Sequence, residues 1–207
     1  MIIGDQEDEG TLFALFQSNL TTEADLIDYL STVFFQKATR EQVVDLVGTY
    51  SSALSAGSPF RTGILNSPYP QFKRLAAMLG DLVFTLSRRL FLESATAVNP
   101  NVPSWSYLAS YDYGTPILGT FHGSDILQVF YGILPNYASE AIQSYYFSFL
   151  YTMDPNNGTP KGIAEWPQWK ESKQLLNMYS SYSKLLKDDF RSMSAQWIAD
   201  NAASFHI

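Results

Sequence analysis

The sequence is dominated by one long run of apolar residues at helical spacing. Between Phe72 and Leu90 an apolar side chain recurs every three or four positions, which predicts an amphipathic helix over residues 72–93. Arg88 and Arg89 are expected in its last turns, where positive charge favours the helix dipole. An apolar face of this length needs an apolar partner elsewhere in the fold.

Strand and helix signals flank this segment on both sides. Residues 1–4 and 105–110 are predicted to be strands, and each leads into a polar loop. Capping signals and apolar spacing predict further helices. One begins after Thr22 and ends at Phe34, one runs from the capping box Thr39-Arg40-Glu41-Gln42 to Gly48, and one runs from Ser139 to Leu150. A last helical stretch contains Leu185, Leu186, Phe190, Trp197 and Ile198. A mostly helical chain whose polar loops follow its strands predicts an α/β fold with its chemistry at the strand ends.

The composition excludes several classes of function. Hydrophobic residues make up 46% and charged residues 16% of the 207, which is typical of a folded protein, and the net charge of −7 disfavours a nucleic-acid partner. The absence of cysteine excludes disulfides and thiol catalysis. No apolar run is long enough for a transmembrane segment. No H-E-x-x-H, P-loop or dinucleotide-binding glycine motif occurs, so no cofactor is expected.

Four carboxylates crowd the turn Asp5-Gln6-Glu7-Asp8-Glu9-Gly10 after the first predicted strand. The simplest interpretation is a solvated turn. The spacing also imitates the first half of a calcium-binding EF-hand loop, but that loop needs a bidentate glutamate at its twelfth position, where this chain has Phe16. A calcium site is therefore rejected.

His122 is one of only two histidines and lies in the loop Gly119-Thr120-Phe121-His122-Gly123-Ser124-Asp125. A lone histidine is more often structural than catalytic. Its place after a strand favours a catalytic base, provided that a carboxylate, such as one from the acidic turn, orients its imidazole. His206 is expected to be a tail residue. No serine lies in a G-x-S-x-G nucleophile elbow, so the chain offers an acid and a base without a nucleophile.

These two loops resemble those of the type-B carboxylesterases, the family of the cholinesterases and the fungal extracellular lipases. The acidic turn is similar to the loop with a D-E-G ending that carries the family's triad acid, and residues 121–126 are similar to its histidine loop. Two further segments resemble the family, Phe149–Asn156 and Glu165–Pro167. The resemblance is greatest to the fungal lipases, through Ser58–Gly63, Phe72–Arg74 and Lys187–Arg191. The resemblance extends from Ile2 to at least Arg191.

The resemblance implies an α/β-hydrolase fold and a Ser-His-Glu triad, with Glu9 as the acid and His122 as the base. In the family the nucleophile elbow and the oxyanion loop precede the acid. Residues 1–207 are therefore expected to be a C-terminal segment of one hydrolase domain, helix-rich with a few strands of the central sheet. The implied reaction is hydrolysis of carboxylic esters by a triacylglycerol lipase or sterol esterase, at a lipid–water interface. Without the N-terminal part as partner, this chain is expected to be inactive, with a frayed first strand and exposed apolar surface.

Two glycosylation sequons, Asn19-Leu20-Thr21 and Asn157-Gly158-Thr159, favour a secreted, extracellular glycoprotein.

Two alternatives to a hydrolase segment stay open. One is a non-catalytic, cholinesterase-like interaction protein or a degenerate remnant. The other is an α-rich domain without a site, which predicts that Glu9 and His122 lie far apart.

Overall fold

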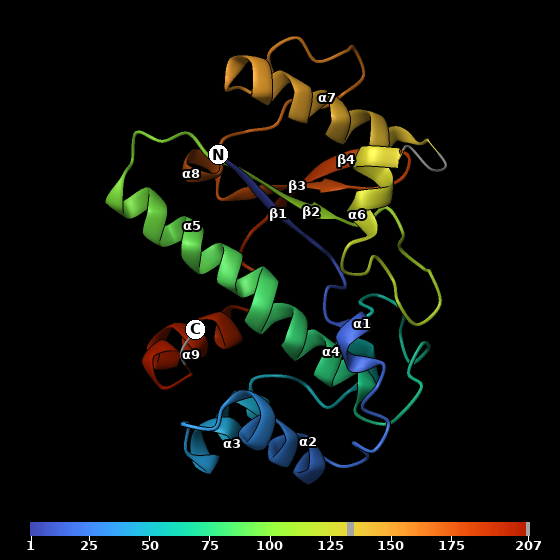
Figure 1. Cartoon of the computed structure of the whole chain (residues 1–207), viewed down its shortest axis with the longest axis vertical. Coiled ribbons are helices and arrows are strands. Elements are labelled where there is room, and N and C mark those ends of the chain that lie inside the picture. The colour runs from blue at the N-terminus through green and yellow to red at the C-terminus, as the bar shows by residue number, and fades with distance from the viewer. Residues whose placement is uncertain (132–134, 206–207) are drawn as a thin grey trace.

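Across residues 1–131 and 135–205, which the computed structural model describes, the chain folds around a four-stranded mixed sheet (Figure 1). Its strands are β1 (Ile2–Gln6), β2 (Trp105–Ala109), β3 (Gln174–Met178) and β4 (Ser183–Lys187), in that spatial order. β1, β2 and β3 run parallel, with Ile2 opposite Trp105 and Tyr107 opposite Leu176. β4 returns antiparallel to β3.

Helices connect and cover these strands. They are α1 (Thr11–Ala14), α2 (Glu23–Tyr29), α3 (Arg40–Gly48), α4 (Phe72–Gly80), α5 (Leu86–Val98), α6 (Ser124–Ile126), α7 (Tyr137–Thr152), α8 (Trp169–Ser172) and α9 (Ser192–Phe205). Single π-helical turns form η1 (Leu30–Phe34), η3 (Asp81–Thr85) and η4 (Leu127–Tyr131), and a 3-10 turn forms η2 (Leu54–Ala56). None of the described helices is long and apolar enough to cross a membrane.

Alternation along β2 builds a core on each face of the sheet. Trp105 and Tyr107 point into an aromatic cluster with Tyr145 of α7, whose ring meets that of Trp166 at 5.0 Å. Leu108 points the other way, into a second cluster that contains residues of α5, α8 and β3. α7 and α5 therefore cover opposite faces of the sheet (Figure 1). A third core joins α2, α3, α4 and α9 beyond the sheet.

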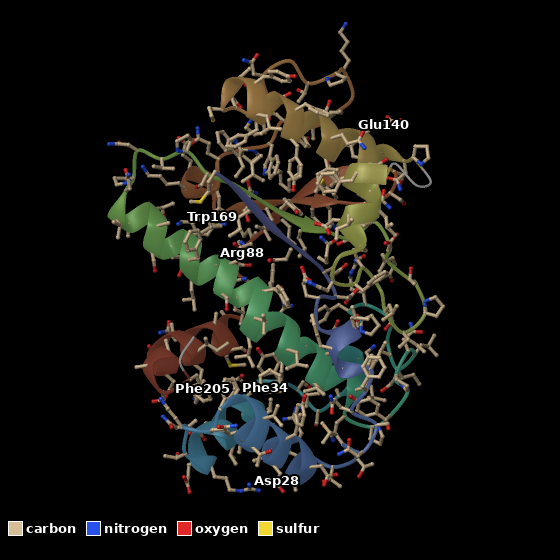
Figure 2. The ribbon with its side chains drawn as sticks, viewed as in Figure 1. Asp28, Phe34, Arg88, Glu140, Trp169 and Phe205 are labelled. Carbon is tan, nitrogen blue, oxygen red and sulfur yellow. The ribbon has the colours of Figure 1, made fainter. Side chains whose placement is uncertain are left out.

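A buried ion cluster fastens α5 to the sheet. Arg88 Nε donates a hydrogen bond to Asp5 of β1 at 2.6 Å, and its terminal nitrogens donate to both oxygens of Asp188 at 2.7 and 2.9 Å. Trp169, which lies on the same side of the sheet as Arg88 in Figure 2, donates a hydrogen bond to Asp188 at 2.8 Å. Burial opposes ionisation of Asp188, but the hydrogen bonds from Arg88 and the charges of Arg88 and Arg89 outweigh it and lower the pKa of that carboxyl. The cluster fixes β1 directly before the acidic turn.

The long helix is present, but it extends further than predicted. It begins at Phe72 and continues through α4, η3 and α5 to Val98, past residue 93. Arg88 and Arg89 consequently lie in the helix interior, where they take part in the ion cluster. Their assignment to the helix dipole is therefore wrong.

Local capping signals are confirmed. Thr22 accepts a hydrogen bond from the backbone N–H of Asp25, and Thr39 from that of Gln42, each within a capping box. The helix predicted to start at Ser139 is α7, and it begins slightly earlier, at Tyr137, because the Asn136 side chain caps it.

The prediction for the C-terminal stretch is wrong. Leu185 and Leu186 lie in β4, and the helix that contains Trp197 begins only at Ser192. β4 is an edge strand that leaves Leu185 45% exposed, so its sequence lacks the alternation that marks a half-buried strand. The predicted tail residue His206 lies outside the described residues.

Candidate active site

The acidic turn lies beside the histidine loop, although 113 residues separate Glu9 from His122. A parallel bridge joins Asp8 to Phe121 beyond the ends of β1 and β2, and Asp8 N donates to Thr120 O at 3.0 Å. Both loops therefore meet at the carboxyl edge of the parallel strands, where α/β sheets place their functional groups.

Glu9 and His122 form a hydrogen-bonded pair. Oε2 of Glu9 lies 2.7 Å from Nδ1 of His122, and Oε1 accepts the backbone N–H of Gln6 at 2.8 Å. The Glu9 side chain is 6% exposed, whereas that of His122 is 42% exposed. Burial raises the pKa of Glu9, and the hydrogen bonds from Gln6 and His122 oppose that rise. A proton on Nδ1 leaves Nε2 of His122 as a proton acceptor.

Apolar side chains lie against the imidazole. The ring centroids of Phe13 and Phe84 lie 5.2 and 4.8 Å from that of His122. Both phenylalanines also belong to an apolar pocket of about 240 Å³, which is lined by Phe13, Phe34, Leu79, Val83 and Phe84. Phe34, which Figure 2 labels, lies in η1 between α2 and α3. An apolar group in this pocket would therefore lie next to the imidazole.

The other carboxylates of the turn are not solvated, so the simplest interpretation of the turn is wrong. Asp5 and Asp8 are 4% and 1% exposed. Glu7 forms an ion pair with Arg61. Burial raises the pKa of Asp5 to about 6, although Arg88 opposes the rise. Burial and the charge of Glu7 raise the pKa of Asp8 to about 6.

Two glycines let the backbone adopt this arrangement. A Cβ on Gly10 would lie 1.9 Å from the carbonyl oxygen of Ala76 in α4, so only glycine allows the turn to pack directly on that helix. Gly123 adopts a φ of 80° immediately after His122, a left-handed conformation that glycine reaches without strain. It turns the chain into α6 and leaves the imidazole at the surface.

The serines nearest to an elbow motif do not contact the histidine. Ser58 Oγ donates to Asp8 at 2.8 Å and Ser124 Oγ donates to Gln6 at 3.3 Å. Within residues 1–131 and 135–205, no hydrogen bond reaches Nε2 of His122. The same part of the chain contains no group of three histidine or carboxylate side chains that could hold a metal ion.

Known proteins share both the sequence and the fold of this chain. It is 61% identical over 206 residues to secreted lipase 1 of Botryotinia fuckeliana, and 59% identical over 208 residues to the secreted triacylglycerol lipase LIP1 of Gibberella zeae. The chain is homologous to the fungal lipases of the type-B carboxylesterase family. These alignments cover 100% of the chain, but the chain spans only 36% and 35% of the two relatives. No family model matches the sequence.

The fold prediction is confirmed by comparison with solved structures. The crystal structure of Aspergillus niger EstA matches the entire chain with a TM-score of 0.81 at 20% sequence identity, and the match covers 40% of EstA. The lipase homologue described here therefore has part of an α/β-hydrolase fold, with β1, β2 and β3 as parallel strands of its sheet.

The aromatic contacts around His122 could not be predicted from the sequence. Phe13 follows Glu9 by four residues, which is a weak signal that both face the same site. Phe84 lies within the long helix, where an apolar residue is most simply interpreted as core. Its contact with His122 depends on how η3 packs beside β1, which is a tertiary feature.

Proposed function

We propose that this lipase homologue supplies the acid Glu9 and the base His122 of a Ser-His-Glu triad in a carboxylic ester hydrolase. The observation that carries the proposal is the 2.7 Å contact between a buried carboxylate and Nδ1 of a partly exposed imidazole at the carboxyl edge of the sheet. The nucleophilic serine comes from sequence outside this chain. The relatives' greater length supports this, as does the lack of a serine hydroxyl on Nε2 among the described residues.

In the proposed triad, His122 carries each proton transfer. Nε2 of His122 takes the serine proton as the serine attacks the ester carbonyl carbon, and the resulting imidazolium then gives that proton to the leaving alcohol. A water molecule, activated by the same nitrogen, hydrolyses the acyl-enzyme. Throughout, Glu9 holds the proton on Nδ1 and stabilises the imidazolium.

The surroundings of His122 favour an ester with apolar chains. The pocket beside Phe13 and Phe84 is lined only by carbon-rich side chains, and two of its lining residues, Phe13 and Val83, are 43% and 53% exposed. An exposed apolar surface of this kind suits a substrate at a lipid–water interface. The name of the Gibberella zeae relative favours a triacylglycerol over a sterol ester as the substrate class.

The 207 residues are proposed to form one part of a single hydrolase domain, which the rest of the fold completes. β1 lies at the edge of the described sheet. Leu150 and Tyr151 at the end of α7 are 70% and 86% exposed, and Leu150 lines a cleft with Ile2. An open edge beside apolar side chains favours a protein partner. The isolated chain is expected to bind hydrophobic dyes and self-associate, and a sharp cooperative melt of a soluble, dye-free monomer would contradict this.

A chimaera tests the catalytic proposal. The 207 residues replace the aligned region of the Botryotinia fuckeliana secreted lipase 1, whose alignment spans the entire chain at 61% identity. The chimaera is expected to hydrolyse p-nitrophenyl butyrate and an emulsified triacylglycerol, and His122→Ala to abolish both activities. The 207-residue chain alone is expected to show no turnover.

The outcome that overturns the proposal is equally clear. A chimaera that keeps its activity after His122→Ala would show that the base is wrongly assigned. A 207-residue chain whose own turnover disappears with that substitution would show that the nucleophile lies within the chain. Circular dichroism of each variant separates loss of chemistry from loss of fold.

Secretion and glycosylation complete the proposal. Asn19 and Asn157 are both exposed and lie in turns, where an oligosaccharyltransferase can reach a sequon. Expression through a fungal secretory pathway is expected to add N-glycan at both asparagines, so that Asn19→Gln and Asn157→Gln each remove one peptide-N-glycosidase-sensitive mass increment. A secreted protein without glycan at either residue would contradict the modification.

A further inference from the structure

Asp8, the neighbour of the proposed triad acid, joins three loops through one buried carboxylate. Oδ1 accepts hydrogen bonds from Ser58 Oγ and from the backbone N–H of Phe60, both at 2.8 Å. Oδ2 accepts the backbone N–H of Thr120 at 3.1 Å. Thr120 lies two residues before His122, so this carboxylate spans from the acid's own turn to the segment that carries the base.

A second side chain strengthens the same connection. Thr11 is fully buried, and its Oγ1 lies 2.7 Å from Leu118 O and 2.9 Å from Asp8 O. Gly119 lies in sequence between Leu118 and Thr120, the two residues that accept and donate these hydrogen bonds. Its φ is 59°, and a Cβ there would lie 2.1 Å from Oδ2 of Asp8. The backbone of the histidine loop therefore approaches the carboxylate as closely as glycine allows.

We propose that Asp8, assisted by Thr11, is a positioning residue that sets the separation of Glu9 and His122. The inference rests on the proposed triad. No hydrogen bond joins the Asp8 carboxylate to either triad side chain among the described residues, so it acts through the backbone. Release of the Thr120 bond frees the histidine loop to move relative to Glu9, and small displacements of a base are costly to catalysis.

Two substitutions at the same buried carboxylate separate this role from simple stabilisation. In Asp8→Asn, the carbonyl oxygen can still accept hydrogen bonds from Ser58 and Phe60. The new NH₂ group faces the backbone N–H of Thr120, and because both groups are donors, the hydrogen bond to Thr120 is lost. Ser58→Ala removes one hydrogen bond of the same carboxylate on the side away from the histidine. Both variants are made in the lipase chimaera, and the thermal midpoint of each is measured.

The expected result is a loss of kcat in Asp8→Asn on the order of 100-fold, with KM unchanged. Ser58→Ala is expected to keep the kcat of the parent chimaera at a comparable thermal midpoint. Thr11→Val removes a bond to the histidine loop while it preserves side-chain shape, and it is expected to lower kcat in the same direction. This third variant keeps the inference testable if Asp8→Asn does not fold.

Equal losses in Asp8→Asn and Ser58→Ala that follow the folded fraction, or an unchanged kcat in Thr11→Val, would overturn the positioning role. An inactive parent chimaera would instead refute the triad proposal itself. The two failures are therefore distinguishable.

Discussion

Glu9→Gln tests the triad with almost no change in side-chain shape. Glu9 has two hydrogen-bond partners, the backbone N–H of Gln6 at 2.8 Å and Nδ1 of His122 at 2.7 Å. The backbone group can only donate, so the carbonyl oxygen of the new glutamine is held toward Gln6. Its NH₂ group then faces His122 and donates to Nδ1.

That donation places the imidazole proton on Nε2, the nitrogen that must accept the serine proton. The variant also loses the negative charge that stabilises the imidazolium. In serine proteases the same carboxylate-to-amide change lowers kcat by about 10⁴-fold, which is about 5.5 kcal/mol of transition-state stabilisation. Because Glu9 is buried at 6% exposure, bulk water cannot substitute for its charge, and we expect a loss of this order.

Steady-state kinetics of the lipase chimaera with p-nitrophenyl butyrate measure the effect, and KM is expected to stay near the parent value. Glu7→Gln is the matched control, because Glu7 lies in the same turn but pairs with Arg61. It is expected to keep most of the activity. A Glu9→Gln variant within tenfold of the parent, or equal losses in both variants, would refute the tautomer argument.

Two predictions concern stability, each measured by urea denaturation of the folded chimaera. Arg88→Met leaves Asp5 and Asp188 buried without their shared partner, at a cost of about 3–5 kcal/mol; a cost no larger than that of Arg40→Met, whose ion pair is exposed, would contradict it. Asp5 and Asp8 have folded-state pKa values of about 6 against an ordinary 3.8, so between these pH values the folded state binds more protons than the unfolded state. The two groups' contribution to the free energy of unfolding therefore falls as pH rises from 4 to 6, by up to about 3 kcal/mol per group, and a profile that rises through this window would contradict those values.

The features that could be predicted from sequence are those encoded locally. The capping boxes at Thr22 and Thr39 need only residues three positions apart, and both occur in the structure. The helix from Phe72 is also readable, because its periodicity spans many turns. β4 is different, because its strand state depends on pairing with β3 and its exposed edge carries no alternation.

The acidic turn shows the same limit at the site. Its four carboxylates look solvated in sequence because their partners are remote: Arg88 lies 83 residues after Asp5, and His122 lies 113 residues after Glu9. Resemblance to the carboxylesterases, rather than spacing, placed Glu9 and His122 in one site. Nothing in the sequence indicated that Asp8 binds the histidine loop, since that contact depends on how two strand ends lie together.

The most direct measurement of the central claim is the proton NMR spectrum of the imidazole of His122. The spectrum is recorded on the ¹⁵N-histidine-labelled lipase chimaera, in which the domain is complete, and His122→Ala identifies the resonance that belongs to this imidazole. The account predicts a strongly deshielded Nδ1 proton, held by Glu9, that disappears in Glu9→Gln and persists in Glu7→Gln. An ordinary, rapidly exchanging imidazole in the folded parent, unaffected by Glu9→Gln, would contradict the acid–base pair.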